Sequence, residues 1–219
     1  MVLFSQQIYT LISTALTELE ASQASGRTPK NPLNEAHYFG AWVTTAMKQK
    51  RFDTIVLPTL KAWQSKARSL GKGAQLKEQF IYLQQCYNQV LDENKQVQAV
   101  NLTKLQALIA QLENEQWMVN TDLVVGNKLN RHSGGASSLI ICETQMHDCF
   151  DEQGTLIKPL SLYLRGDLSE LVNCAFEQNL LLHKMTDYKS KVKYHGEFII
   201  YPNNDGDKLP EFPIKPEAE

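Results

Sequence analysis

The sequence lacks the motifs that usually announce an activity. It contains no H-E-x-x-H, G-x-S-x-G or G-x-G-x-x-G pattern, which would mark a zinc protease, a serine hydrolase or a dinucleotide site. Glycine is also scarce, at 11 of 219 residues, so glycine-rich loops that hold nucleotides are few. We therefore assign no catalytic residue and expect no cofactor. An enzyme with a dispersed site stays open, but a non-catalytic protein is favoured.

Long apolar runs and a strong net charge are missing as well. No run approaches the roughly 18 residues that a membrane-spanning helix needs, and the start of the chain lacks the basic region and cleavage site of a signal peptide. With a formal net charge of −2, the protein as a whole has no positive electrostatic potential that would attract nucleic acid or an anionic membrane. We expect a cytoplasmic protein without a membrane partner, in which any contact with nucleic acid is local.

The four cysteines form no C-x-x-C pair. Cys142, His147 and Cys149 have side chains that bind metals, but C-x4-H-x-C is not a zinc spacing and no fourth ligand lies nearby in the sequence. Hydrophobic residues make up 42% of the chain, which is enough for a core that needs no disulfide. We expect reduced thiols and no metal site.

Apolar residues in the first half recur at steps of three and four, which is typical of amphipathic helices. Asn34 is the expected cap of a second helix, Gly71 and Gly73 are expected to end a third, and Asn101 to start a fifth. These segments predict a bundle of about five helices over residues 1–116.

After Trp117 the chain changes to short segments rich in branched residues, which are typical of strands. Asp167 and Glu170 have the spacing of a capping box, before a helix that Asn179 is expected to end. We predict an α+β fold, in which the bundle packs with a small antiparallel sheet containing one crossing helix over residues 117–202. Residues 203–219 are rich in acid and proline and predict a tail that is either mobile or laid on the surface, where it could fold back over the basic strand.

The stretch MTDYKSKVKYHGEF, residues 185–198, concentrates lysines, tyrosines and a histidine. With a period of two, Val192 and Tyr194 face the core while Lys191, Lys193 and His195 face solvent. A turn at residues 188–190 would place His183 opposite His195. This exposed face is either a solvated edge that resists pairing with other chains or a contact for an anion or nucleic acid. The candidate residues are His183, Lys184, Tyr188, Lys189, Lys191, Lys193 and His195.

A second basic segment, NKLNRHSGGASS, has a glycine pair that can wrap a phosphate. It lacks the G-K-[ST] of a P-loop and no helix clearly follows it, so a mobile connector is the favoured interpretation. The phosphate-loop candidates are Lys128, Arg131, His132, Gly134 and Gly135.

Three stretches together carry a family resemblance: NPLNEAHYF from Asn31, LSLYLRGD from Leu160, and LLLHKMTDYKSKVKYHGEF from Leu180. With them the chain resembles a family of gammaproteobacterial proteins, a domain of unknown function, over nearly its whole length. The resemblance implies a bacterial cytoplasmic origin and no activity, and it transfers no catalytic or binding residue.

Three functional hypotheses follow. The first is a non-catalytic regulator or adaptor that holds a protein partner or a second copy of itself, which requires a contiguous exposed apolar patch. The second is a binder of nucleic acid or a phospholigand through residues 184–195. The third is an enzyme whose site lies between bundle and sheet and contains groups of perturbed pKa. The sequence favours the first.

Overall fold

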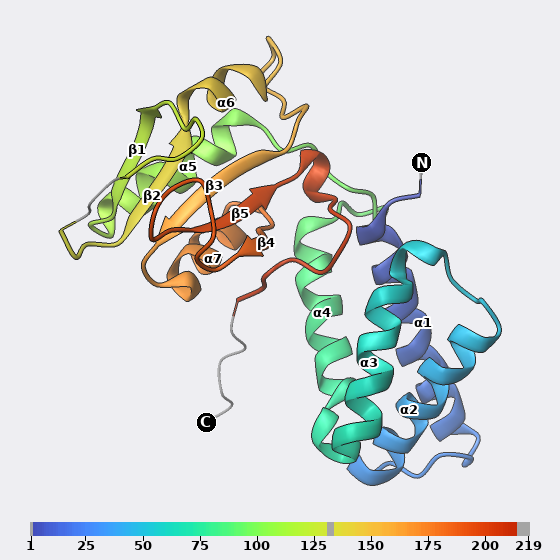
Figure 1. The fold of residues 1–219 in the computed structure, drawn as a ribbon. Coiled ribbons are helices and arrows are strands. Elements are labelled where there is room, and N and C mark those ends of the chain that lie inside the picture. The colour runs from blue at the N-terminus through green and yellow to red at the C-terminus, as the bar shows by residue number, and fades with distance from the viewer. Residues whose placement is uncertain (1, 131–133, 214–219) are drawn as a thin grey trace. The chain divides into compact units, whose positions relative to one another are not determined.

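The computed structural model describes residues 2–130 and 134–213. Over these residues the chain forms seven α-helices and a five-stranded sheet, which confirms the predicted α+β class. It divides into two compact units, a helical unit that ends at Gln96 and a sheet unit that begins at Val97 (Figure 1).

The helical unit contains four α-helices joined by short turns. The apolar stripes of the sequence face one another inside it, so that Ile8, Phe39, Phe80 and Tyr87 are fully buried. Gly40 lies next to Ala67 of another helix, and a β-carbon at Gly40 would lie 3.6 Å from the β-carbon of Ala67, an ordinary van der Waals distance. The elements are α1 (Phe4–Ala24), α2 (Pro32–Lys48), the 3-10 turn Thr54–Val56, α3 (Leu57–Leu70), the 3-10 turn Gly71–Ala74 and α4 (Leu76–Val90).

Asn31, rather than Asn34, caps α2. Its side-chain oxygen accepts a hydrogen bond from the backbone N–H of Asn34 at 3.0 Å. Pro32 follows as the first helical residue, where its missing N–H would have had no partner within the helix. The expected cap therefore lay one turn too late, because Pro32 starts the helix earlier than the apolar stripe does.

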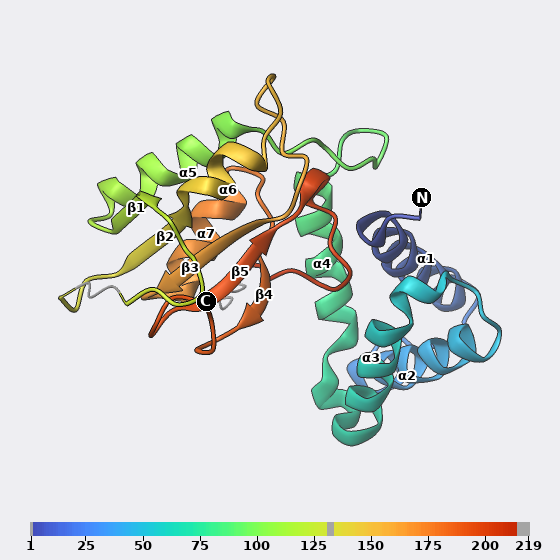
Figure 2. The same cartoon turned by 45° about the horizontal axis from the view of Figure 1, so that its top comes forward.

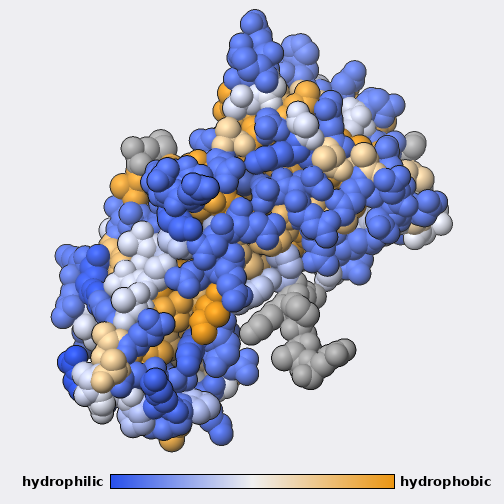
Figure 3. Space-filling model, turned by 180° about the vertical axis from the view of Figure 1, so that it is seen from behind, coloured by the Kyte–Doolittle hydropathy of each residue, from blue (hydrophilic) through white to orange (hydrophobic). Residues whose placement is uncertain are grey.

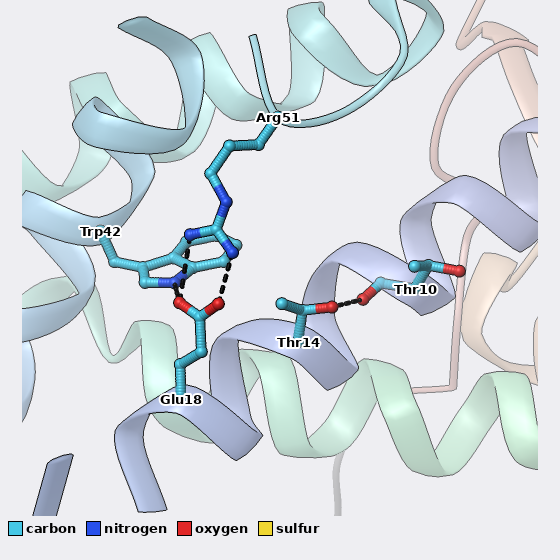
Figure 4. Close-up of polar contacts among 5 residues, drawn as sticks. All are labelled: Thr10, Thr14, Glu18, Trp42 and Arg51. Atoms are coloured by element: carbon cyan, nitrogen blue, oxygen red, sulfur yellow. Dashed lines mark hydrogen bonds and ion pairs between the residues drawn. The ribbon is translucent and has the colours of Figure 1, made fainter. Parts of the chain in front are cut away.

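A polar contact between α1 and α2 involves Glu18 (Figure 4). The indole N–H of Trp42 donates to the carboxylate of Glu18 at 2.6 Å, and both terminal nitrogens of Arg51 donate to the same carboxylate. The Arg51 guanidinium also lies 5.2 Å from the centre of the Trp42 ring. Arg51 lowers the pKa of Glu18, so the pair stays ionised at neutral pH.

The sheet has the strand order β1-β2-β3-β5-β4. β1 pairs with β2 in parallel, which was not predicted, whereas all other pairs are antiparallel. Parallel neighbours need a long connection between them, and residues 124–137 provide it. The elements are α5 (Leu102–Asn114), β1 (Met118–Leu123), β2 (Ser138–Cys142), α6 (Glu143–Asp148), β3 (Leu160–Arg165), α7 (Leu168–Glu177), β4 (His183–Thr186), β5 (Gly196–Ile200) and the 3-10 turn Pro202–Asn204.

Helices α5 and α7 cover one face of the sheet (Figures 1 and 2). Leu105, Leu108 and Leu112 of α5 join one apolar core with Leu139 and Ile141 of β2. The fifth helix thus belongs to the sheet unit and does not close the bundle. The division after Gln96 differs for this reason from the boundary expected after residue 116.

The opposite face of the sheet carries a small apolar cluster of Ile140, Tyr163 and Val192. Val192 comes from the segment 187–195 between β4 and β5, and this segment lies over the face instead of extending β5. The strand expected from Lys191 therefore begins only at Gly196. The buried positions in this segment are Val192 and His195, which are three residues apart and so break the period of two.

Residues 203–213, from the tail expected to be mobile or surface-laid, make hydrogen bonds to the residues before β4. The side chain of Asn204 accepts from the backbone N–H of Leu181 at 2.9 Å and donates to the carbonyl of Asn179 at 2.7 Å. Further along, the N–H of Glu211 donates to the carbonyl of Leu182 at 2.7 Å. We call residues 201–213 the strap, because they lie along the end of β4. Residues 214–219 of the predicted tail lie outside the described part of the chain.

Candidate nucleic-acid interface

The two basic segments that the sequence presents separately lie side by side in the sheet unit. The backbone N–H of Leu129 donates to the carbonyl of Lys191 at 2.8 Å, and the N–H of Lys193 donates to the carbonyl of Leu129 at 2.8 Å. Leu129 and Val192 form a parallel bridge as a result. The bridge places Lys128 on the same surface as Lys193, although 64 residues separate Leu129 from Lys193 in the chain.

Tyr194 lies at the centre of this surface and is 53% exposed. The Lys193 ammonium lies 4.7 Å from the centre of its ring, and the Arg165 guanidinium lies 5.9 Å from it. A hydrogen bond from Lys193 and the charges of Lys193, Arg165 and Lys128 lower the pKa of Tyr194. We call Lys128, Arg165, Lys193 and Tyr194 the Tyr194 cluster.

The backbone of Tyr194 has a φ of 65°, in the left-handed region that non-glycine residues seldom occupy. Its two neighbours hold it there. The N–H of Lys193 is bonded to Leu129, and the N–H of His195 donates to the carbonyl of Val192 at 3.1 Å. A strained residue that the structure holds in place is common at binding sites, where the strain fixes a side chain before the ligand arrives.

His195 anchors the segment from below. Its ring is fully buried, with Nδ1 2.9 Å from the carbonyl oxygen of Lys193 and Nε2 2.9 Å from the hydroxyl of Ser138. Because a carbonyl oxygen only accepts, Nδ1 carries the proton and Nε2 accepts from the Ser138 hydroxyl. Burial lowers the pKa of His195, so the ring is neutral at pH 7 and keeps both bonds. Ser138 is buried too, which gives the pair a positioning role.

A groove of about 400 Å³ opens beside Tyr194. Arg165, Tyr188 and Tyr194 line it together with Asp187, and Leu164 and Phe198 contribute apolar lining. Tyr188 is 82% exposed, the highest value among the large hydrophobic and aromatic residues of the described chain. The groove and the Tyr194 cluster share Arg165 and Tyr194 and form one continuous surface.

The predicted site residues divide into three groups. Tyr188, Lys189, Lys191 and Lys193 are exposed as expected. Lys128 is exposed, and Gly134 and Gly135 have positive φ with open space around their α-carbons. Arg131 and His132 lie outside the described residues.

The remaining predicted residues lie elsewhere. Lys184 pairs with Asp187 at 2.5 Å, and its carbonyl accepts from the Lys208 ammonium of the strap. His183 and His195 are buried, so the expected exposed face with two histidines does not form. His183 is opposite Ile199 instead of His195, because β5 begins at Gly196 and the predicted register is wrong.

His183 lies under the strap. It is 1% exposed, its ring meets Tyr201 edge-on at 5.0 Å, and neither ring nitrogen has a hydrogen bond among the described residues. Burial lowers the pKa of His183 to about 4, and the positive charge of Lys208 acts in the same direction. Asp207 and the backbone of Lys208 oppose the shift without cancelling it. The ring is therefore neutral and serves packing.

Sequence reasoning missed two residues that now define the surface. The period of two placed Tyr194 in the core, and Arg165 was not among the candidate residues. Arg165 precedes Gly166, whose φ of 144° turns the chain sharply after β3. A basic residue at a strand end before glycine was the one available signal for Arg165.

Other groups with reactive side chains do not assemble into a site. Cys142 accepts from the N–H of Val125 at 3.3 Å, whereas the side chain of His147 is 90% exposed and pairs with Asp148. Over the described residues, no three His, Cys, Asp or Glu side chains are grouped so that they could hold a metal ion.

The helical unit also has a surface groove, lined by residues of α1, α2 and α4. Two of its charged groups, Glu35 and Lys77, are already paired. Glu35 accepts from the Lys77 ammonium at 2.7 Å and from the Gln23 amide at 2.7 Å. The Tyr194 cluster, in which three cations meet around an aromatic ring, is the stronger candidate.

Comparison with known proteins gives a family but no activity. Residues 3–213 match the family described as "Protein of unknown function (DUF2913)". None of the curated proteins and none of the solved structures matches the chain. No helix in the described residues is long and apolar enough to span a membrane.

Proposed function

The chain belongs to the DUF2913 family, whose description states no activity, and on its own geometry we propose that the sheet unit binds single-stranded nucleic acid. The binding surface is the Tyr194 cluster with the adjoining groove. Phosphates contact Lys128, Arg165 and Lys193, and a base stacks on an exposed tyrosine.

The convergence of three cations from distant segments on Tyr194 carries this proposal. Lysines scattered on a strand edge do not need an aromatic partner, whereas binders of single strands combine a basic track with aromatic rings on which bases stack. The planar guanidinium group of arginine can donate two parallel hydrogen bonds to a phosphate. Arg165 supplies this group, which the lysine-rich residues 184–195 lack.

The surface is also built before any ligand arrives. Two backbone bonds join the basic segments, and the buried bonds of His195 fix the carbonyl of Lys193 and the hydroxyl of Ser138. A ligand then orders few side chains on binding, which lowers the entropic cost of association.

The hypothesis of a regulator or adaptor that contacts proteins needs a contiguous apolar patch. On the face shown in Figure 3, hydrophilic side chains cover most of the sheet unit and the hydrophobic areas are small and separate, with a larger one over the helical unit. Large exposed apolar residues are distributed over both units, for example Leu33 and Leu70 in one and Ile157 and Met185 in the other. The adaptor hypothesis stays a prediction, and the Tyr194 cluster supports nucleic acid more directly.

The test is titration of fluorescent single-stranded 12-mers, as DNA and as RNA, into the full chain at about 50 and 200 mM salt. With three phosphate contacts, the slope of log K against log salt is about −2, so affinity falls roughly 20-fold over this range. Duplexes of the same sequence are expected to bind more weakly, because their bases are already stacked.

A matched pair of charge reversals assigns the binding to the Tyr194 cluster. K193E removes a cation that contacts Tyr194, whereas K191E makes the same charge change two residues away at an exposed side chain that faces no aromatic ring in the described structure. We expect K193E to weaken binding by tenfold or more and K191E by a few-fold. Equal effects of the two variants, or no binding by wild type, would refute the proposal.

A further inference from the structure

The groove beside Tyr194 has a lining that the Tyr194 cluster does not need for phosphate contact. Phosphate binding uses cations, yet the residues that line the groove include the acidic Asp187 and the apolar Leu164 and Phe198. An acidic and apolar lining beside a cationic rim fits a ligand with two parts, a phosphate and an uncharged ring.

We infer that this groove takes one base of the single strand and prefers guanine, with Asp187 as the residue that reads the base. The inference rests on the proposed function and specifies its ligand. The size of the groove, its two tyrosines and the hydrogen-bonding pattern of Asp187 support guanine as the bound base.

The size is suitable for one base with its sugar. The groove of about 400 Å³ lies within the range of roughly 300–1,000 Å³ that small-molecule sites occupy. Tyr188 and Tyr194 both line it, and both rings are more than half exposed. Stacking of a base on such a ring typically contributes about 1–3 kcal/mol and does not distinguish bases. The tyrosines therefore provide affinity, and the choice among bases falls to a polar group.

Asp187 is the one acidic residue among the described residues that line the groove, and its carboxylate can only accept hydrogen bonds. Guanine presents two adjacent donors on its Watson–Crick edge, N1–H and the N2 amino group, which match the two oxygens of one carboxylate. Adenine and cytosine present an amino group next to an acceptor nitrogen. Uracil presents one N–H between two carbonyl oxygens, which a carboxylate repels. Guanine is thus the base that the groove fits best.

Lys184 offsets the negative charge of Asp187, which would otherwise repel a nucleic-acid strand. Its ammonium lies 2.5 Å from one oxygen of Asp187, so the carboxylate does not present an isolated negative charge to the phosphates. A carboxylate has about four lone-pair positions, and the ion pair leaves capacity for bonds to a base. Arg165 lines the groove and also contacts Tyr194, which directs the phosphate of the bound nucleotide towards Lys193.

Single-stranded 8-mers of uridine with one central position changed test the inference, by fluorescence anisotropy with the full chain. The central residue is guanosine, inosine, uridine or an abasic site. We expect guanosine to bind about tenfold more tightly than uridine, because a bidentate contact discriminates by roughly 1–3 kcal/mol. Inosine lacks the N2 amino group and is expected to fall between them. Equal affinities for guanosine and uridine would overturn the inference.

Two variants separate the reading of the base from the ion pair. D187N replaces one acceptor oxygen with a donor, and we expect it to abolish the preference for guanosine, so that the guanosine-containing and all-uridine strands bind equally. K184Q removes the same ion pair but leaves the carboxylate, and we expect it to keep the preference. A preference that survives in D187N, or is lost equally in both variants, would contradict the role of Asp187.

A further arm distinguishes a strand from a free nucleotide. Guanosine 5′-monophosphate, used as a competitor, keeps one phosphate but lacks the neighbouring phosphates of a strand that contact the other cations of the Tyr194 cluster, so we expect it to bind at least tenfold more weakly than the guanosine-containing 8-mer. Equal affinity would overturn the single-strand half of the inference. If none of the 8-mers binds, the proposed function itself fails, whereas binding without preference refutes only the inference about guanine.

Discussion

Gly206 of the strap lies against the imidazole of His183 so closely that a β-carbon at Gly206 would be 2.6 Å from Cε1 and 2.7 Å from Nδ1 of the ring. The ring is buried and has no space to move away. We therefore expect G206A to lower the free energy of unfolding by about 1–3 kcal/mol, as over-packing does in other cores.

The control for this prediction is G126A. Gly126 also has an ordinary φ, and a β-carbon there would meet no atom within 4 Å. Urea unfolding followed by circular dichroism compares the two variants. A G206A protein as stable as G126A would show that the strap does not hold the contact with His183.

His183 also makes a prediction about pH. Its pKa in the folded chain is about 4, below the ordinary value of 6.5, so between these values the unfolded chain binds more protons than the folded one. Stability is therefore complete above pH 6.5 and is lost as the pH falls towards 4, with a slope approaching about 1.4 kcal/mol per pH unit. Burial of His195 acts in the same direction.

Urea midpoints at pH 7, 6 and 5 measure this slope, and H183L isolates its source. We expect H183L to flatten the dependence substantially, whereas H147Q, at an exposed histidine, leaves it as in wild type. An unchanged slope in H183L would assign the acid sensitivity to other groups.

The buried bond between Ser138 and His195 supports the Tyr194 cluster from beneath. S138A leaves Nε2 of His195 without its donor, which typically costs about 1–3 kcal/mol for a buried group. The segment 187–195 then holds Tyr194 less firmly in its left-handed conformation. We therefore expect the affinity of the folded S138A variant for oligonucleotides to fall several-fold. S69A, which changes an exposed serine of α3, is the control for both the free energy of unfolding and the oligonucleotide affinity. Loss of stability without loss of affinity would argue against a link between the anchor and the surface.

The contact of Glu18 with Arg51 and Trp42 predicts a modest stability effect in the helical unit (Figure 4). R51A removes the ion pair and the stacking on Trp42, but both charged side chains are partly exposed and solvent screens them. We expect a loss of about 1 kcal/mol. R51K keeps the positive charge but lacks the planar guanidinium group. We therefore expect R51K to restore only part of the stability that R51A loses. Full recovery in R51K, measured by urea unfolding, would show that charge alone matters.

The sequence predicted most of the helices because their signals are local. The apolar stripe of α4 follows from a period of 3.6, and the caps of Asn101 and Asp167 each act on a neighbour within three residues. Periodicity and caps involve residues close to one another in the sequence, so they can be predicted from the sequence alone.

The candidate site was predicted only in part, because its geometry depends on contacts between distant segments. Lys193 was among the candidates predicted from the sequence, but Arg165 and Lys128, which lie near it in the fold, are far away in the sequence. Tyr194 was assigned to the core, since the burial of Val192 and His195 follows from the loop that covers β2 and β3 and not from a strand period. The parallel pairing of β1 with β2 is likewise a property of topology that local patterns do not contain.

The strap has a consequence for how the protein is made. All contacts that define the helical unit come from the first 96 residues, so this unit can fold while the rest of the chain is still being synthesised. The sheet unit has to wait, because Leu182 pairs with Glu211 and His183 is covered only when Gly206 has left the ribosome. Until then the end of β4 is an unpaired edge next to a partly formed core, and in this interval the nascent chain is most exposed to aggregation.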